Sequence, residues 1–180
     1  MKKLILLFTS ILITFNCALL CQTAKPDSSN AEMFASKPEL FIEKQFIEIG
    51  FVDMIELRIM KIKDLNSGIT RNALRFEYQT TNQIFSQTKL AIVDEDELDA
   101  LIASVHSIIT KEFIIEKETY TEVTFQSRSG FVAGAYYTID KKKWIPFLQL
   151  ERHDSKSTIT VSHEDFSHFL DLLKQAKKMI

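Results

Sequence analysis

The chain of 180 residues contains only two cysteines, Cys17 and Cys21, and both lie near its start. A form that begins after Cys21 has no thiol, so it cannot form a disulfide or use a cysteine as a nucleophile. Its stability must therefore come from buried apolar side chains and not from covalent cross-links.

Glycine and proline are also scarce, with 4 and 3 residues respectively. This scarcity excludes collagen-like and low-complexity sequence, and it leaves no glycine-rich loop to cradle a phosphate group. Positive charge is not in excess, because 22 Lys and Arg face 24 Asp and Glu. A mildly acidic chain lacks the field that attracts nucleic acid or anionic lipid, so neither is expected as a general partner.

The sequence does have 46% hydrophobic residues, including 14 Phe, which suffices for one well-buried domain. Lys2 and Lys3, followed by an apolar run from Leu4 to Phe15, predict a signal peptide over residues 1–21. The run is too short to span a bilayer comfortably, which favours a cleaved signal peptide. The alternative is that this segment is retained as a membrane anchor. We expect an exported bacterial protein, periplasmic or secreted.

Two possibilities remain open for the exported chain: free secretion, and attachment to a membrane through a lipid. Lipid could be attached at Cys17 or Cys21, although neither is preceded by the Leu-x-small pattern of bacterial lipoproteins. Residues 22–38 (QTAKPDSSNAEMFASKP) are mostly small and polar, so we expect a flexible linker there. Residues 39–180 then form the single folded domain.

One unit occurs twice in this domain: a strand that runs into a capped amphipathic helix. Leu90–Val93 precedes the cap Asp94, and Thr158–Val161 precedes the cap Ser162. Acidic residues three positions after each cap, Glu97 and Asp165, complete a capping-box pattern. The apolar anchors follow at identical i, i+3, i+4 and i+7 offsets: Leu98, Leu101, Ile102 and Val105 in the first helix, and Phe166, Phe169, Leu170 and Leu173 in the second.

Segments with strand composition precede both helices. In the first half they cover residues 46–49, 54–63, 71–78 and 90–93, and in the second half residues 120–128, 131–139, 144–150 and 158–161. We therefore predict an α+β fold with two main helices. It consists of two antiparallel halves of four strands and one helix, residues 46–113 and 119–180. Each half buries one sheet face poorly alone, so the two should pack as an internal pseudo-dimer.

A duplicated unit of four strands and one helix resembles the Whirly-type fold, shared with coactivator-like proteins that bind single-stranded DNA. The resemblance covers residues 46–180 and concerns architecture, since the Lys-Gly-Lys-Ala-Ala-Leu motif of Whirly proteins does not occur here. It implies that a sheet surface could bind single-stranded nucleic acid. Segments 73–76 (ALRF) and 127–131 (SRSGF) are similar to those of small uncharacterised exported bacterial proteins, which implies no activity.

Two groups of residues suggest metal sites but have the wrong spacing. His163 and His168 are five residues apart, whereas a zinc-binding helix needs a separation of four. The acid-rich stretch 94–99 lacks the Gly and Glu of an EF-hand loop. We expect no metal, no cofactor and no catalytic residue. A Ser-His-Asp triad stays open because its members can be distant in sequence, although no Gly-x-Ser-x-Gly elbow occurs.

The candidate ligand-binding residues are basic and aromatic side chains in the predicted hairpins, because aromatic rings stack on bases or sugars while Arg and Lys bind phosphates or carboxylates. Tyr136 and Tyr137 point to opposite faces of one strand, so only one of them can join such a surface. The alternative is an ordinary solvated sheet face with a buried Trp and a charged turn. The candidates are Arg71, Arg75, Arg128, Tyr137, Lys142 and Trp144.

The function favoured by these patterns is that of a non-catalytic binding or interaction module for an unknown ligand or protein partner in the cell envelope. Two alternatives remain. One is single-stranded nucleic-acid binding by the sheet surface, and the other is a cell-envelope hydrolase.

Overall fold

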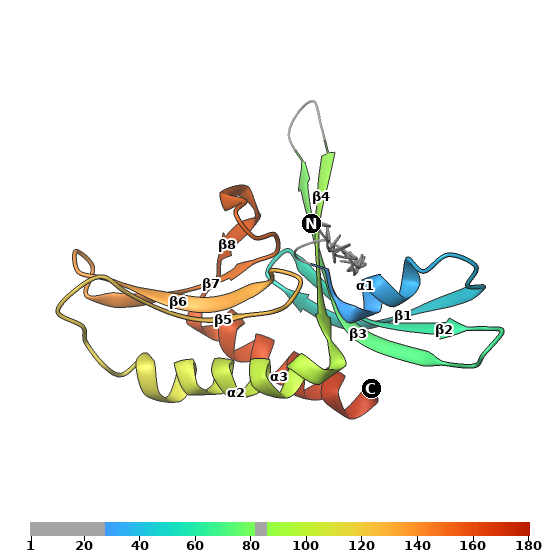
Figure 1. Cartoon of the computed structure of the whole chain (residues 1–180). Coiled ribbons are helices and arrows are strands. Elements are labelled where there is room, and N and C mark those ends of the chain that lie inside the picture. Colours follow the sequence, from blue (N-terminus) through green and yellow to red (C-terminus); the bar gives the residue numbers. More distant parts are fainter. Residues whose placement is uncertain (1–27, 82–85) are drawn as a thin grey trace, which may run out of the picture.

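The computed structural model describes residues 28–81 and 86–180. It contains two four-stranded antiparallel sheets, with the strand orders β1-β2-β3-β4 and β5-β6-β7-β8. Figure 1 shows the two sheets at opposite ends of the molecule, with helices α2 and α3 lying side by side against them. The predicted α+β fold with two main helices is confirmed. The predicted signal peptide lies outside the described residues.

The first half has the four strands and the helix that the sequence predicts, with longer strands and an irregular helix. Its elements are α1 (Asn30–Ala35), β1 (Ile42–Val52), β2 (Ile55–Asp64), β3 (Thr70–Thr81), β4 (Ser86–Asp94), a 3-10 turn (Glu95–Glu97), α2 (Leu98–Ser107) and a π-turn (Ile108–Glu112). Each strand pairs with the next one in sequence, as expected for a chain of hairpins.

The second half repeats this order. Its elements are β5 (Thr121–Gln126), β6 (Val132–Thr138), β7 (Lys143–Gln149), a 3-10 turn (Ser155–Ser157), β8 (Thr158–Thr160) and α3 (His163–Met179). Ser162 caps α3 with Asp165 as its capping-box partner, as predicted. Among the described residues, no helix is both long and apolar enough to cross a bilayer.

The two halves share one hydrophobic core. Phe76 on β3 stacks against Phe131, the residue just before β6, with ring centroids 4.3 Å apart. Phe169 on α3 lies edge-on to both rings, at 6.0 and 6.4 Å. The predicted helix anchors are buried except for Ile102, which is partly buried and packs against the same core. Three aromatic rings from both halves therefore form the centre of a continuous core.

Each main helix contacts the sheet of the other half. Helix α2, which closes the first half, packs on β5 and β6, while α3 packs on β1 as well as on β7. Gly50 lies at a β-bulge in β1, where a Cβ atom would be 3.1 Å from a methyl carbon of Leu172. The glycine thus allows α3 to approach the first sheet closely.

The prediction of a flexible linker over residues 22–38 is wrong for its second part. Residues Asn30–Ala35 form a helix whose N-cap Ser29 and capping-box partner Glu32 make both reciprocal hydrogen bonds. Ala31 and Phe34 are buried against the outer face of the first sheet. The composition of this segment is polar, but a Ser-x-x-Glu cap and one Phe suffice to dock a short helix. Residues 22–27 lie outside the described residues.

We therefore expect Phe34→Ala to destabilise the protein. The Phe34 ring is only 8% exposed and packs in a small cluster with Met60, Ile62 and Ala73. Its loss should lower the free energy of unfolding by about 2–3 kcal/mol, slightly below the range for a central Phe because the cluster is small. Urea unfolding measures the change. The control is Lys37→Ala at an exposed neighbour, and equal stability of both variants would show that α1 does not dock in solution.

Candidate functional site

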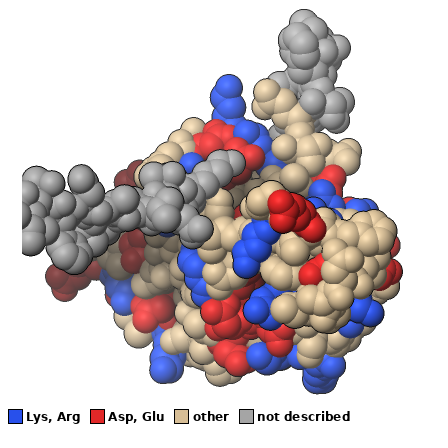
Figure 2. Space-filling view, turned by 45° about the vertical axis from the view of Figure 1, so that its right-hand side comes forward, with Lys and Arg blue, Asp and Glu red and all other residues tan. Residues whose placement is uncertain are grey.

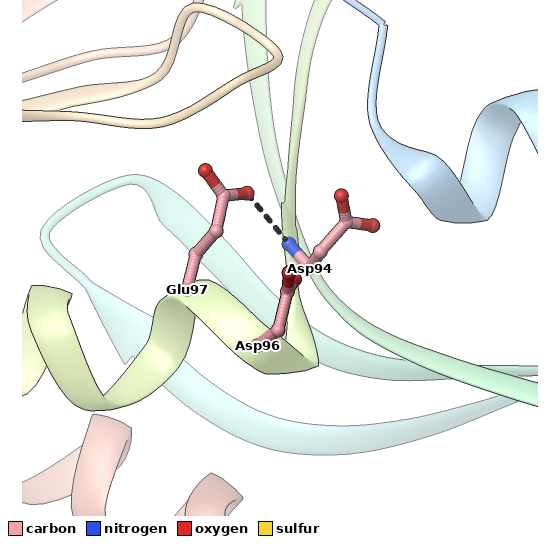
Figure 3. A group of neighbouring side chains, drawn as sticks. All are labelled: Asp94, Asp96 and Glu97. Atoms are coloured by element: carbon pink, nitrogen blue, oxygen red, sulfur yellow. Dashed lines mark hydrogen bonds between the residues drawn. The ribbon is translucent and has the colours of Figure 1, made fainter.

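The corner between β4 and α2 carries the largest group of acidic side chains that approach one another among the described residues. Asp94 ends β4, and its backbone N–H donates to Glu97 Oε2 at 3.3 Å, as the predicted capping box requires. Carboxylate oxygens of Asp94, Asp96 and Glu97 lie within 4.8 Å of one another. Figure 3 shows that the three carboxylates point in different directions from this one corner.

The Asp94 carboxylate also holds the N-terminal helix. It accepts hydrogen bonds from the backbone N–H groups of Asn30 at 2.7 Å and Ala31 at 2.9 Å, and Asp94 is only 3% exposed. Figure 3 shows this side chain pointing toward the start of α1. N–H groups in the first turn of a helix have no partner within the helix, so a carboxylate from another element satisfies them.

Arg128, from the turn between β5 and β6, brings the second half to the same corner. Its guanidinium donates to Asp94 Oδ2 and to Asp96 Oδ2, both at 2.6 Å, and its backbone N–H donates to Glu97 Oε1 at 2.7 Å. The hydrogen bonds with Asp96, together with the charges of Glu97 and Asp94, raise the pKa of the Arg128 guanidinium. The next residue, Ser129, donates its hydroxyl to the carbonyl of Ile92 at 2.5 Å.

Three segments that are far apart in sequence therefore meet at the Asp94 corner: α1, the β4–α2 connection and the β5–β6 turn. A cation bound by Asp94, Asp96 and Glu97 would have to displace the guanidinium of Arg128. The chemistry of the corner is accordingly that of an internal ion-pair network, which joins the two halves and the N-terminal helix.

A groove with a volume of about 1190 Å³ opens beside this corner. It lies between α1, the start of β3 and the start of α2, and Lys177 near the end of α3 also contributes. We call it the α1–α2 groove. Its lining residues are Ser28, Asn30, Ala31, Glu32, Met33, Phe34, Ser36, Lys37, Pro38, Thr70, Arg71, Asn72, Asp94, Glu95, Asp96, Asp99 and Lys177.

Polar groups on β3 face the groove where β4 no longer pairs. The β3–β4 ladder ends at the pair Ala73 and Asp94, so Thr70–Asn72 have no β4 residue opposite them. The Asn72 side chain donates to Glu95 Oε2 at 3.0 Å, while its buried Oδ1 has no hydrogen-bond partner within the described residues. Buried acceptors are normally paired, so this oxygen is an exception among the buried polar atoms.

The sequence-predicted binding residues do not form one surface. Arg71 lines the α1–α2 groove, with its guanidinium 5.7 Å from the centre of the Phe34 ring. Arg75 lies on the outer face of the first sheet, 2.8 Å from a Glu77 carboxylate oxygen. Lys142 is in the β6–β7 turn. Arg128 is committed to the Asp94 corner.

Tyr137 and Trp144 were predicted to belong to a ligand-binding surface, but the structure buries both. Both rings are in the core, only 2% and 3% exposed, and lie edge-to-face with centroids 5.5 Å apart. The Trp144 indole N–H donates to the Ile115 carbonyl at 2.9 Å. The strand alternation correctly separated Tyr136 from Tyr137, but it did not show which face of the sheet the helices cover, and the buried face carries Tyr137.

Sequence patterns did not select three important residues of this site. Asp96 and Asn72 were not singled out, and Asp94 was predicted only as a helix cap and not as a tertiary contact. One sequence signal for part of this site was present, the capping pattern of Ser29 and Glu32 that predicts a helix start. No pattern in the sequence indicates that Arg128 meets Asp94.

Comparisons with protein-family models, with curated proteins and with solved structures found no match for this chain.

Proposed function

We propose that this chain is an exported, non-catalytic binding module that takes a polypeptide ligand in the α1–α2 groove. The observation that carries the proposal is the groove itself, whose volume of about 1190 Å³ exceeds the roughly 300–1,000 Å³ typical of small-molecule pockets. A groove of this size, lined mostly by polar residues together with exposed apolar surface, suits an extended polymer better than a compact cofactor.

The charges of the groove favour a cationic ligand. Five acidic residues (Glu32, Asp94, Glu95, Asp96 and Asp99) and three basic ones (Lys37, Arg71 and Lys177) line it. Asp94 and Asp96 share Arg128, and Asp99 pairs with Lys177 at 3.0 Å and is 76% exposed. A nucleic-acid site needs an excess of positive charge to replace phosphate counterions, so this balance argues against the nucleic-acid alternative.

Backbone groups support a peptide in particular. Thr70–Asn72 pair with β2 on one side but have no β4 residue opposite them, so the other edge of β3 leaves main-chain groups for a ligand strand. An extended peptide can satisfy such an edge by adding a short strand, with its side chains reaching the acidic residues.

The lining chemistry does not include the pair that a serine hydrolase of the Ser-His type uses. In that chemistry an adjacent His activates the hydroxyl nucleophile. The described residues that line the groove include Ser28, Ser36 and Thr70 but no His. The Ser36 hydroxyl donates to the Met33 carbonyl, 3.1 Å away, within its own helix turn.

Calorimetric titration with two matched peptides tests the proposal. We expect an acetylated, amidated heptapeptide that alternates Lys and Val to bind, and its Glu–Val counterpart not to bind. Asp99→Asn should weaken binding about three- to tenfold, because it removes one charge partner of the peptide. Asp171→Asn is the matched control, since Asp171 is also 76% exposed but lies on α3 outside the groove lining. Equal affinity for the two peptides, no binding of either, or retention on single-stranded oligonucleotide at low salt would contradict the proposal.

A further inference from the structure

The end of the first sheet that carries the β2–β3 turn presents three large apolar side chains to solvent. Phe41, Leu65 and Ile69 are 64%, 43% and 47% exposed. They belong to one surface, because the Leu65 N–H donates to the Phe41 carbonyl at 2.7 Å and the Asp64 N–H donates to the Ile69 carbonyl at 2.9 Å. We call these three residues the hairpin tip. It lies at the right-hand end of Figure 1.

The backbone of the hairpin tip is held firmly by one buried carboxylate. Asp64 is 4% exposed and accepts hydrogen bonds from the Asn66 N–H at 3.0 Å and the Ser67 hydroxyl at 2.5 Å. These hydrogen bonds hold the pKa of Asp64 below its usual value, and the bond from the Ser67 hydroxyl has the largest effect. These hydrogen bonds brace the backbone of the turn that carries the exposed apolar side chains. Neighbouring exposed apolar side chains on a braced turn are a candidate interaction site.

The charge around the hairpin tip differs in sign from that of the rest of the chain. Segments 37–44 and 61–71 contain five Lys and Arg and three Asp and Glu, and one of these three acids is the internal Asp64. The two segments thus carry a net charge of +2 in a chain whose total is −2, so the remainder carries −4. Figure 2, in which this end comes forward, shows uncharged surface with both basic and acidic side chains beside it.

We propose that the hairpin tip docks into the interface of a membrane that contains anionic lipids. Phe41, Leu65 and Ile69 would enter the boundary between headgroups and acyl chains, while the exposed Lys63 approaches the lipid phosphates. A stable protein partner needs about 800 Å² on each side, contributed by roughly 20–30 residues, and three projecting side chains do not supply that. Shallow insertion into a bilayer needs only such a few apolar groups and a basic border.

A tryptophan placed at the hairpin tip tests the proposal in the full chain. Leu65→Trp introduces the reporter at the tip, and Met54→Trp is the matched control, because Met54 is 58% exposed in the β1–β2 turn at the opposite end of the same strands. Native Trp144 is 3% exposed and gives a constant background. Vesicles of brominated phosphatidylcholine with phosphatidylglycerol should quench the Leu65→Trp emission at least twofold more than the Met54→Trp emission.

The paired reporters remain informative even if the first residues of the chain hold it on the vesicle, since both variants share that segment. Adding Phe41→Ser and Ile69→Ser to Leu65→Trp should reduce the quenching to the level of the control. Equal quenching of the two reporters would overturn the proposal, as would quenching that is unchanged when phosphatidylglycerol is omitted. A change of oligomeric state in these serine variants, without tip-specific quenching, would assign the hairpin tip to a protein contact instead.

Discussion

Phe131→Ala is expected to lower the free energy of unfolding by about 3–5 kcal/mol, the range for removal of a fully buried Phe side chain. The Phe131 ring has no exposed surface and stacks on Phe76 of the other sheet at 4.3 Å, with Phe169 edge-on at 6.4 Å. The truncation leaves a cavity between two sheets and a helix. Because α2 and α3 each cross to the other half, neither sheet can shift to fill that cavity without disturbing the second.

Denaturant titration followed by two probes measures this effect. Trp144 fluorescence reports on the second sheet, whereas far-ultraviolet circular dichroism reports on both halves, and the two transitions should coincide in the wild type and in the variant. Phe41→Ala is the control, because Phe41 is 64% exposed and should change the free energy of unfolding by less than about 0.5 kcal/mol. Two separate transitions would show that the halves fold independently, which the shared core forbids.

Asp94→Ala should be the most damaging substitution of a charged residue, at about 3–4 kcal/mol. The carboxylate is nearly inaccessible, and its removal leaves the N–H groups of Asn30 and Ala31 without their acceptor. It also deprives Arg128 of its most buried partner. The expected consequence is loss of α1 from the sheet, which limited proteolysis near residues 28–38 would detect alongside the fall in stability.

Asp96→Ala provides the matched control at the same corner. Asp96 contacts the same guanidinium at 2.6 Å, but its side chain is 62% exposed, so the change should cost less than about 1 kcal/mol. A double-mutant cycle between Asp94 and Arg128 should give a coupling of about 1–3 kcal/mol. If Asp96→Ala were as costly as Asp94→Ala, burial would not be the source of the effect and the structural account of the corner would be wrong.

Much of the architecture follows from local patterns. Residues 71–78 were predicted as a strand, and the structure places alternate residues of this strand, Leu74, Phe76 and Tyr78, on its core face. The caps Asp94 and Ser162 predict both helix starts. These predictions succeed because strand alternation and helix capping depend on residues within a few positions of one another.

Predictions of tertiary contacts were less successful. The polar composition of residues 22–38 predicted a linker, yet Phe34 finds an apolar strip on the outer face of the first sheet. Tyr137 and Trp144 were selected for a binding surface and are buried, because the strand pattern does not state which of two faces the helices cover. Arg128 was selected as a ligand-binding residue and instead pairs with acids 32 and 34 positions earlier in the chain.

The sequence by itself determined the order of the strands and the two main helices, their buried stripes, the division into two similar halves and the absence of any thiol beyond Cys21. Only the tertiary structure decided that α2 packs on the second sheet and α3 on both sheets, that Asp94 joins three distant segments and that the α1–α2 groove exists. The reason is physical. The hydrophobic effect is non-directional, so it requires only that the apolar face of each half be buried against some other apolar surface. A short, buried hydrogen bond, in contrast, requires one particular pair of residues to meet.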